Sequence, residues 1–232
     1  KKGEKASATA SKFIQKEFPF FVPSTASEDE AKGSIEKILL KAHEQVVQVG
    51  KKYGIPSSKA PETTASIVKI LDNGIAVIGN VGDGRVYRLQ NGNSELEHLT
   101  LDDGLARRKY GEEKGLEIQK LLANSHSFKN FPQELQDIIE SKHLMSQSLG
   151  QERSIKPRIY SCQLASGDRL LLSTDGVHDN LTDGEIKDIV LKYPDNAQEA
   201  AKTLIKESKE KSKSNSQRAK PDDMSAIVVI VN

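Results

Sequence analysis

The stretch Leu170–Ile186, LLLSTDGVHDNLTDGEI, leads from an apolar run directly into a pair of carboxylates. The run of leucines predicts a buried strand, and Asp175 and Asp179 follow it on either side of a glycine. A carboxylate beside an apolar core is costly unless a positive charge faces it. We therefore expect a cation near the end of this strand, and the nature of that cation decides the function.

The composition limits the class of protein. The chain of 232 residues is long enough for one sizeable core, and we expect a single domain over residues 1–232. Its 34 Lys and Arg balance 33 Asp and Glu, with a net charge of +1, so no overall field favours nucleic acid or an anionic membrane. Apolar stretches are of strand length, too short to span a membrane. The single cysteine, Cys162, excludes an intramolecular disulfide and predicts a cytoplasmic location.

Hydrophobic periodicity predicts helices in the first quarter of the chain and strands after it. Residues 6–18 and 34–49 have the three-and-four spacing of amphipathic helices, and Pro19 is expected to end the first. Residues 63–101 change to alternating, β-branched segments separated by Asn-Gly and Gly-Asp-Gly turns. This pattern predicts a continuous antiparallel meander.

The second half of the chain mixes strands with helix pairs. Residues 104–145 are charged and helical in parts, and we interpret them as a variable, flap-like insert. Strands are predicted at 159–164 and 169–173, and Thr182 with Glu185 forms a capping box that begins a helix. A second helix, a basic segment KESKEKSKSNSQRAK interpreted as a solvated loop, and a terminal strand follow. The order predicts an α+β fold, a four-layer α-β-β-α sandwich of two antiparallel sheets flanked by helix pairs.

Aspartates also stand at the ends of other predicted strands. Asp102 follows one strand, Asp83 follows another, and Asp222 comes directly before the last strand. Clustered oxygen ligands, without a cysteine set or a suitable histidine pair, favour the hard cations Mg²⁺ or Mn²⁺. Taken singly, however, each aspartate is more often a turn residue or helix cap, so both readings stay open at this point.

A set of strings in a fixed order resembles the metal-dependent protein phosphatases (PPM), the type 2C serine/threonine phosphatase family. The strings are TTASIV, IGNVGDGRVYRL, LTLDD, SQSLG, GDRLLLSTDGVHDNLTDGEI and PDDMSAIVVI, within residues 63–231. The resemblance implies hydrolysis of phosphoserine and phosphothreonine in proteins by a metal-activated water. It also implies Mg²⁺ or Mn²⁺ as cofactor, two ions with a third held more weakly. We expect a monomer whose partner is a phosphorylated protein, with neither nucleic acid nor membrane as a partner.

The resemblance assigns roles position by position. Asp175 and Asp222 match ligands of the metal pair, and Asp179 and Asp102 match ligands of the third ion. Asp83 matches a turn that shapes the fold, and we do not expect it to be a ligand. The attacking group is expected to be water activated by metal, and no residue is assigned to substrate binding.

The family's N-terminal Asp-Gly-x-Gly-Gly motif, whose aspartate bridges both metals, does not occur in this sequence. The opening KKGEKASATASKF resembles the helix that follows the motif, so we expect a chain trimmed just downstream of it. The alternative is a catalytically impaired, phosphatase-like binding or regulatory module.

Other polar residues near these strings have competing interpretations. Arg85 and Arg88 are candidates to grip phosphate, but we interpret them as solvated arginines on a strand face. His178 is a candidate acid catalyst, but we interpret it as a packing residue.

Overall fold

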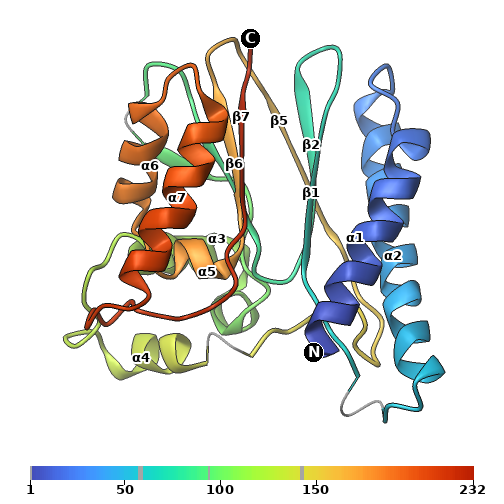
Figure 1. Cartoon of the computed structure of the whole chain (residues 1–232), viewed down its shortest axis with the longest axis horizontal. Coiled ribbons are helices and arrows are strands. Elements are labelled where there is room, and N and C mark those ends of the chain that lie inside the picture. The colour runs from blue at the N-terminus through green and yellow to red at the C-terminus, as the bar shows by residue number, and fades with distance from the viewer. Residues whose placement is uncertain (1, 57–59, 94, 142–143) are drawn as a thin grey trace. The chain divides into compact units, whose positions relative to one another are not determined.

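The protein is described by a computed structural model that covers residues 2–56, 60–93, 95–141 and 144–232. The chain divides into two compact units, each built from an antiparallel sheet and helices (Figure 1). The first unit comprises Lys1–Gly82 and Met145–Leu164, and the second comprises Asp83–Leu144 and Ala165–Asn232. The prediction of an α+β protein with two antiparallel sheets is confirmed.

The first unit packs two long helices against a three-stranded sheet of order β1-β2-β5. Its elements are α1 (Lys2–Phe21), α2 (Glu28–Lys52), β1 (Ala65–Ile70), β2 (Ile75–Val81) and β5 (Arg158–Gln163). The two helices lie side by side, and α2 contacts the sheet directly (Figure 1). Gly79 of β2 allows this contact, because a Cβ there would lie 2.3 Å from Ile35 and 2.8 Å from Leu39.

Both helices of the first unit differ from the predicted bounds. A capping box of Ser27 and Glu30 begins α2 at Glu28, upstream of the predicted start at residue 34. The prediction that Pro19 ends the first helix is wrong, since α1 continues to Phe21 with Pro19 inside it. A proline removes one backbone hydrogen bond to the preceding turn, and here that loss falls in the last turn, where the helix ends anyway.

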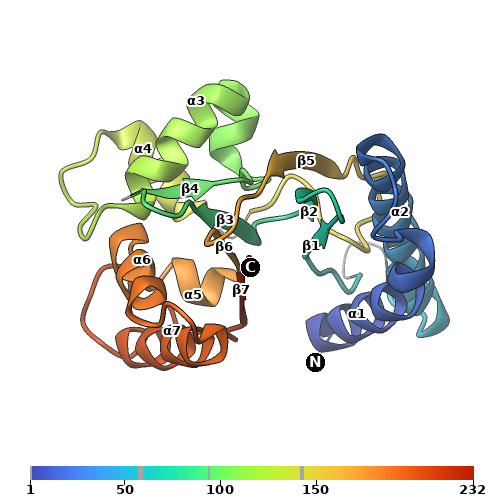
Figure 2. The same ribbon diagram turned by 90° about the horizontal axis from the view of Figure 1, so that it is seen from above.

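The second unit contains the four-stranded sheet of order β4-β3-β6-β7. Its strands are β3 (Arg85–Leu89), β4 (Leu96–His98), β6 (Arg169–Ser173) and β7 (Ala226–Ile230). Its helices are α3 (Leu105–Ala123), α4 (Gln133–Glu140), α5 (Asp175–His178), α6 (Asp183–Lys192) and α7 (Ala197–Lys211). Helices α6 and α7 cover one face of the sheet, with Tyr87 and Leu171 packed against Leu181, Ile186 and Leu204 (Figure 2).

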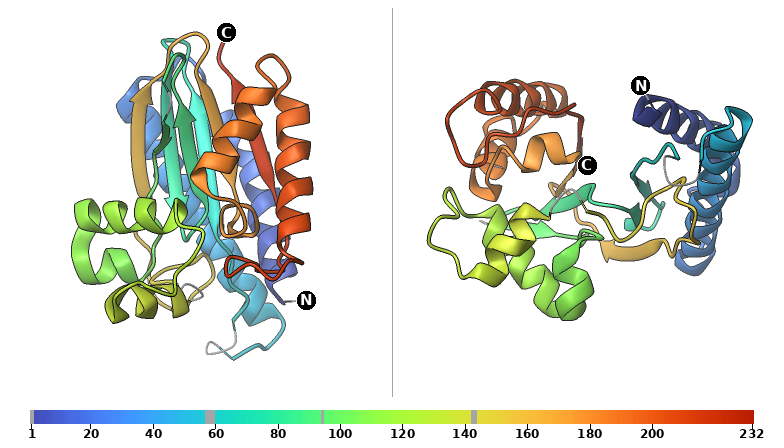
Figure 3. Two further views of the ribbon diagram at one scale, coloured as in Figure 1. Left: turned by 90° about the vertical axis from the view of Figure 1, so that its left-hand side faces the viewer. Right: turned by 90° about the horizontal axis from the view of Figure 1, so that it is seen from below.

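Helices α3 and α4 lie together in the second unit (Figure 3), and Asn124 at the end of α3 donates to Asp183 of α6 at 3.1 Å. They account for most of the segment 104–145 that was interpreted as an insert, and they share a small apolar cluster around Ile118, Leu122 and Ile138. Over the described part of the chain, none of the helices combines the length and apolar character that crossing a membrane requires.

The predicted continuous meander is wrong, because β2 and β3 belong to different sheets. The hairpins β1–β2 and β3–β4 do form. Between them the chain leaves the first unit at Gly82, whose φ of +103° lies in the left-handed region. A Cβ at this position would also lie 2.3 Å from the side chain of Thr64, so the turn requires glycine.

Asp168 is a buried carboxylate that directly precedes β6 and contacts Arg88 of β3. Its carboxylate accepts hydrogen bonds from the Arg88 guanidinium at 2.6 and 3.0 Å and from the backbone N–H groups of Asn91 and Ala165 at 2.9 and 3.0 Å. Asp168 is 2% exposed and the Arg88 side chain 12%, so the interpretation of Arg88 as a solvated surface residue is wrong. Burial opposes ionisation, but these donors outweigh it and hold the pKa of Asp168 below its ordinary value.

Replacing Asp168 by alanine should lower the free energy of unfolding by about 3 kcal/mol, because Arg88 would lose its buried partner. Chemical denaturation at neutral pH measures the change. Since the pKa of Asp168 is lowered by folding, its contribution is present above about pH 4 and is lost as the pH falls through the folded pKa. The variant should therefore lose less stability than the parent on acidification.

Asp188→Ala is the matched control, because the Asp188 side chain is 76% exposed on α6. It should change the free energy of unfolding by less than about 0.5 kcal/mol. Equal, small effects of the two substitutions would show that Asp168 does not stabilise the second unit.

Candidate functional site

The end of β6 and the start of β7 bring the predicted site residues together in the second unit. Asp175 opens the short helix α5 directly after β6, and Asp179 is the C-cap residue of that helix. The backbone N–H of Thr174 donates to the Ser225 carbonyl at 3.1 Å, and the Ser225 N–H donates to the Thr174 hydroxyl at 2.9 Å. These bonds hold the segment that contains Asp222 beside the segment that contains Asp175.

Gly176 is the second reason why the two segments approach so closely. A Cβ at this glycine would lie 2.3 Å from the backbone oxygen of Asp223 and 3.0 Å from the side chain of Met224. The glycine between Asp175 and Asp179 thus allows the close approach of the two backbone segments.

The cation at the end of the strand is the ammonium group of Lys220. Its Nζ lies 2.5 Å from Asp175 Oδ2, 3.2 Å from Asp179 Oδ2 and 3.6 Å from Asp222 Oδ2. Because one nitrogen contacts all of these carboxylates, the predicted ligands Asp175 and Asp222 lie near each other in the fold. Burial opposes the charge of Lys220, but attraction to Asp179 and hydrogen bonding to Asp175 outweigh it and raise the pKa of the ammonium.

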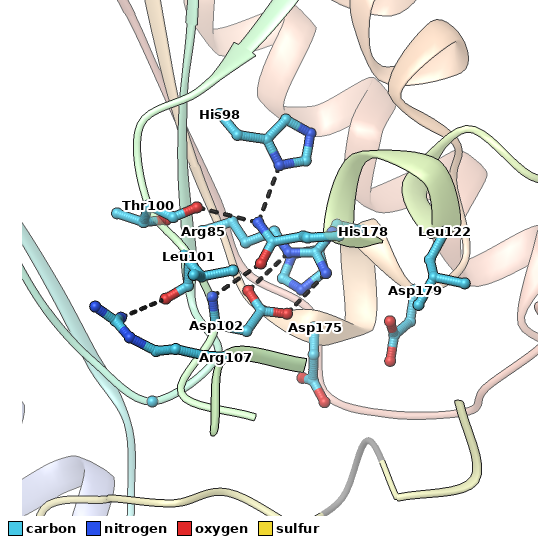
Figure 4. Close-up of polar contacts among 12 residues, drawn as sticks. Arg85, His98, Thr100, Leu101, Asp102, Arg107, Leu122, Asp175, His178 and Asp179 are labelled. Carbon is cyan, nitrogen blue, oxygen red and sulfur yellow. Dashed lines mark hydrogen bonds and ion pairs between the residues drawn. The ribbon is translucent and has the colours of Figure 1, made fainter. Parts of the chain in front are cut away.

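Asp102, the fourth predicted ligand, is held by Arg85 (Figure 4). The guanidinium of Arg85 forms a bidentate pair with the Asp102 carboxylate, at 2.9 Å through Nε and 2.8 Å through Nη2. Gln119 of α3 fixes the backbone around Asp102, since it accepts from the Asp102 N–H at 2.8 Å and donates to the Thr100 carbonyl at 3.0 Å. Arg85 is 6% exposed, so its interpretation as a solvated arginine is wrong.

Asp83 lies in the same electrostatic environment. Burial raises the pKa of the Asp83 carboxyl to about 7. The like charges of Asp102, Asp175 and Asp179 act in the same direction. Asp83 therefore shares the electrostatic environment of the predicted ligands, although the sequence analysis treated it only as a turn residue.

The donor chemistry of this cluster fits a hard divalent cation. Carboxylate oxygens are the ligands that Mg²⁺ and Mn²⁺ prefer, and a positive group already lies where the carboxylates of Asp175, Asp179 and Asp222 converge. In the described ranges, no group of three or more His, Cys, Asp or Glu side chains is arranged to hold a metal ion. The aspartates are arranged around the Lys220 ammonium.

Arg218 is a buried residue near the site that the sequence analysis missed, because the segment around it has the composition of a solvated loop. It is 6% exposed and donates to four backbone carbonyls at 2.7 to 3.0 Å. The acceptors belong to Leu122, Ser125, His178 and Leu181. Arg218 thereby ties the chain before Lys220 to the ends of α3 and α5.

Asn180 fixes Lys220 itself. Its side-chain amide accepts from the Lys220 N–H at 2.9 Å and donates to the Lys220 carbonyl at 2.9 Å and to the Gly176 carbonyl at 2.8 Å. His178 is 2% exposed and shares a hydrogen bond with the Ser173 hydroxyl at 3.0 Å. Its interpretation as a packing residue is confirmed.

Gly176→Ala should separate the Asp175 and Asp222 segments, because the added methyl group collides with the Asp223 backbone rather than with a flexible side chain. We expect a loss of about 1 to 3 kcal/mol in the free energy of unfolding, the usual cost of overpacking. Chemical denaturation measures it.

Gly184→Ala is the matched control, because the nearest atom to a Cβ there is the Thr182 hydroxyl oxygen at 3.9 Å, an ordinary contact. This variant should be as stable as the parent. A Gly176→Ala protein with unchanged stability would contradict the close approach.

Solved structures with the same fold include serine/threonine phosphatases. Stp1 from Staphylococcus aureus matches with a TM-score of 0.71 and 18% identity, over 99% of this chain and 78% of that chain. The catalytic domain of the phosphatase PstP, crystallised with two manganese ions, matches with a TM-score of 0.68 and 18% identity, over 97% of this chain and 82% of that chain. At this level of identity the likeness defines the fold, which is that of the PPM phosphatases.

Sequence comparison assigns the family. The family model of stage II sporulation protein E (SpoIIE) matches residues 110–232. The protein phosphatase PhpP from Streptococcus pneumoniae is 30% identical over 128 residues, which cover 55% of this chain and 44% of that protein. The chain belongs to the SpoIIE family, among the PPM phosphatases, and the matched region spans less than half the length of PhpP.

Proposed function

We propose that this chain hydrolyses phosphoserine and phosphothreonine monoesters in proteins with the help of divalent metal ions. The observation that carries the proposal is the convergence of Asp175, Asp179 and Asp222 on one cation at the end of β6. Membership of the phosphatase family supports it. The two units together would then form one phosphatase domain.

Mg²⁺ or Mn²⁺ is the cofactor that this donor set suits best. Asp175 and Asp222 would hold the metal pair, and Asp179 and Asp102 would hold a third, weaker ion. When bound, such ions lower the pKa of a water molecule and neutralise phosphoryl oxygens. The two manganese ions in the PstP crystal structure support the choice of metal.

The chain's own residues would position this chemistry. Arg85 would orient Asp102 through Nε and Nη2, and its Nη1 donates to the Tyr87 hydroxyl at 3.4 Å. Arg85 is therefore a positioning residue for Asp102 rather than a grip for substrate phosphate. Asn180 and Arg218 fix the main chain that leads to Asp222.

The substrate would be a phosphorylated protein recognised by a cytoplasmic monomer. Specificity is expected to depend on the segment 104–145, which contains α3 and α4. Gln119 of α3 contacts the Asp102 backbone, so this segment is linked to the proposed metal site.

A second candidate function is a binding or regulatory module without catalysis. One observation favours it: the ammonium of Lys220 contacts the same carboxylate oxygens that a metal ion would use.

The test is release of phosphate from a phosphothreonine peptide in the presence of Mn²⁺. Asp175→Asn should reduce the rate by roughly a hundredfold or more, because a ligand of the metal pair loses its charge. Asp195→Asn, at an exposed position, is the matched control and should keep the parent rate. Equal rates in EDTA and in Mn²⁺ would exclude the metal-dependent mechanism, and no activity under either condition would favour the binding module.

A further inference from the structure

Asp175, Asp179 and Asp222 form an aspartate cluster, and Lys220 contacts this cluster through its side chain. Its Nζ meets the Oδ2 atoms of Asp175, Asp179 and Asp222 within 3.6 Å. The other oxygen of Asp175 accepts from the Gly176 N–H at 2.9 Å, and the other oxygen of Asp222 accepts from the Asp223 N–H at 2.8 Å. The oxygens that face the centre of the cluster are therefore those that the ammonium uses.

The main chain of Lys220 is fixed by groups that do not belong to the cluster. The buried Asn180 amide holds both its N–H and its carbonyl, and Arg218 anchors the chain nearby. The Lys220 side chain, in contrast, is 38% exposed. Rotation about its flexible side-chain bonds can carry the ammonium from the carboxylates to solvent without moving the backbone.

A divalent ion and the Lys220 ammonium would compete for the same Oδ2 atoms of Asp175, Asp179 and Asp222. Both need to approach the Oδ2 atoms directly, and their positive charges repel each other at such distances. Without a metal ion, the ammonium relieves the repulsion among the carboxylates. A metal ion at these oxygens would disfavour the same ammonium position by charge repulsion.

We propose that Lys220 is an internal competitor for the metal: its ammonium occupies the aspartate cluster, a divalent ion must displace it, and Lys220 thereby sets the metal affinity of the site. This inference rests on the proposed function, because it needs a site that binds metal. The effect is reciprocal, since metal binding and the Lys220–aspartate contacts weaken each other by the same factor.

Lys220→Met tests the competition, because methionine keeps much of the apolar stem and removes the ammonium. In calorimetric titration of the full chain with Mn²⁺, the variant should bind about tenfold more tightly than the parent, within the usual range of coupling between two ligands. In EDTA it should melt at a lower temperature than the parent, because the carboxylates lose their counter-ion. Added Mn²⁺ should then raise its melting temperature by more than it raises that of the parent.

Lys213→Met is the matched control, since it removes the same charge at an exposed position of the same connection. It should bind Mn²⁺ as the parent does. If Lys220→Met binds Mn²⁺ more tightly than the parent and Lys213→Met binds it with the parent's affinity, the competition is supported. This result also rules out an effect of net charge.

Two outcomes would overturn the inference in distinguishable ways. If the parent and Lys220→Met bind Mn²⁺ with equal affinity, the competition is wrong and the proposed metal-dependent function stands. If neither protein binds Mn²⁺, the proposed function fails and the inference fails with it.

Discussion

Carboxylates that converge at the end of an apolar strand repel one another unless a cation lies between them. The contacts around the end of β6 follow from this constraint. Strand β6 is buried between β3 and β7, so it delivers Asp175 to a place where an unpaired negative charge would be costly. Basic side chains supply the positive charge. Lys220 forms ion pairs with Asp175, Asp179 and Asp222, and Arg85 forms an ion pair with Asp102. Burial and the nearby charges of Asp102, Asp175 and Asp179 raise the pKa of the Asp83 carboxyl to about 7.

Two kinds of polar contact are present in this region: some hold the backbone, and others balance the charge of the aspartates. Buried contacts hold the backbone: Arg218 donates to four carbonyls, and Asn180 bonds both the N–H and the carbonyl of Lys220. More exposed contacts, those of the Lys220 ammonium, balance the charge. Because the backbone contacts do not involve the ammonium, the exchange of cations that we propose would leave the aspartates in place.

The sequence predicted the parts of the fold that depend on local chemistry. The bounds of β2 and β6 follow from alternation and turn residues, and the capping box at Thr182 begins α6 as expected. The passage from one sheet to the other at Gly82 was missed, since periodicity does not show which strands pair. Lys220 and Arg218 were also missed, because their partners are aspartates or backbone carbonyls distant in sequence, and their surroundings have the composition of a solvated loop. The residue types predicted the aspartate carboxylates as metal donors. The position of the Lys220 ammonium between them is seen only in the folded structure.

The most direct test of this account is the anomalous X-ray scattering of crystals grown with Mn²⁺. The account predicts an anomalous peak between the carboxylates of Asp175 and Asp222, with the Lys220 Nζ moved out of hydrogen-bonding distance of both. Crystals that show no peak at these aspartates, with the Lys220 ammonium still bonded to Asp175, would contradict it.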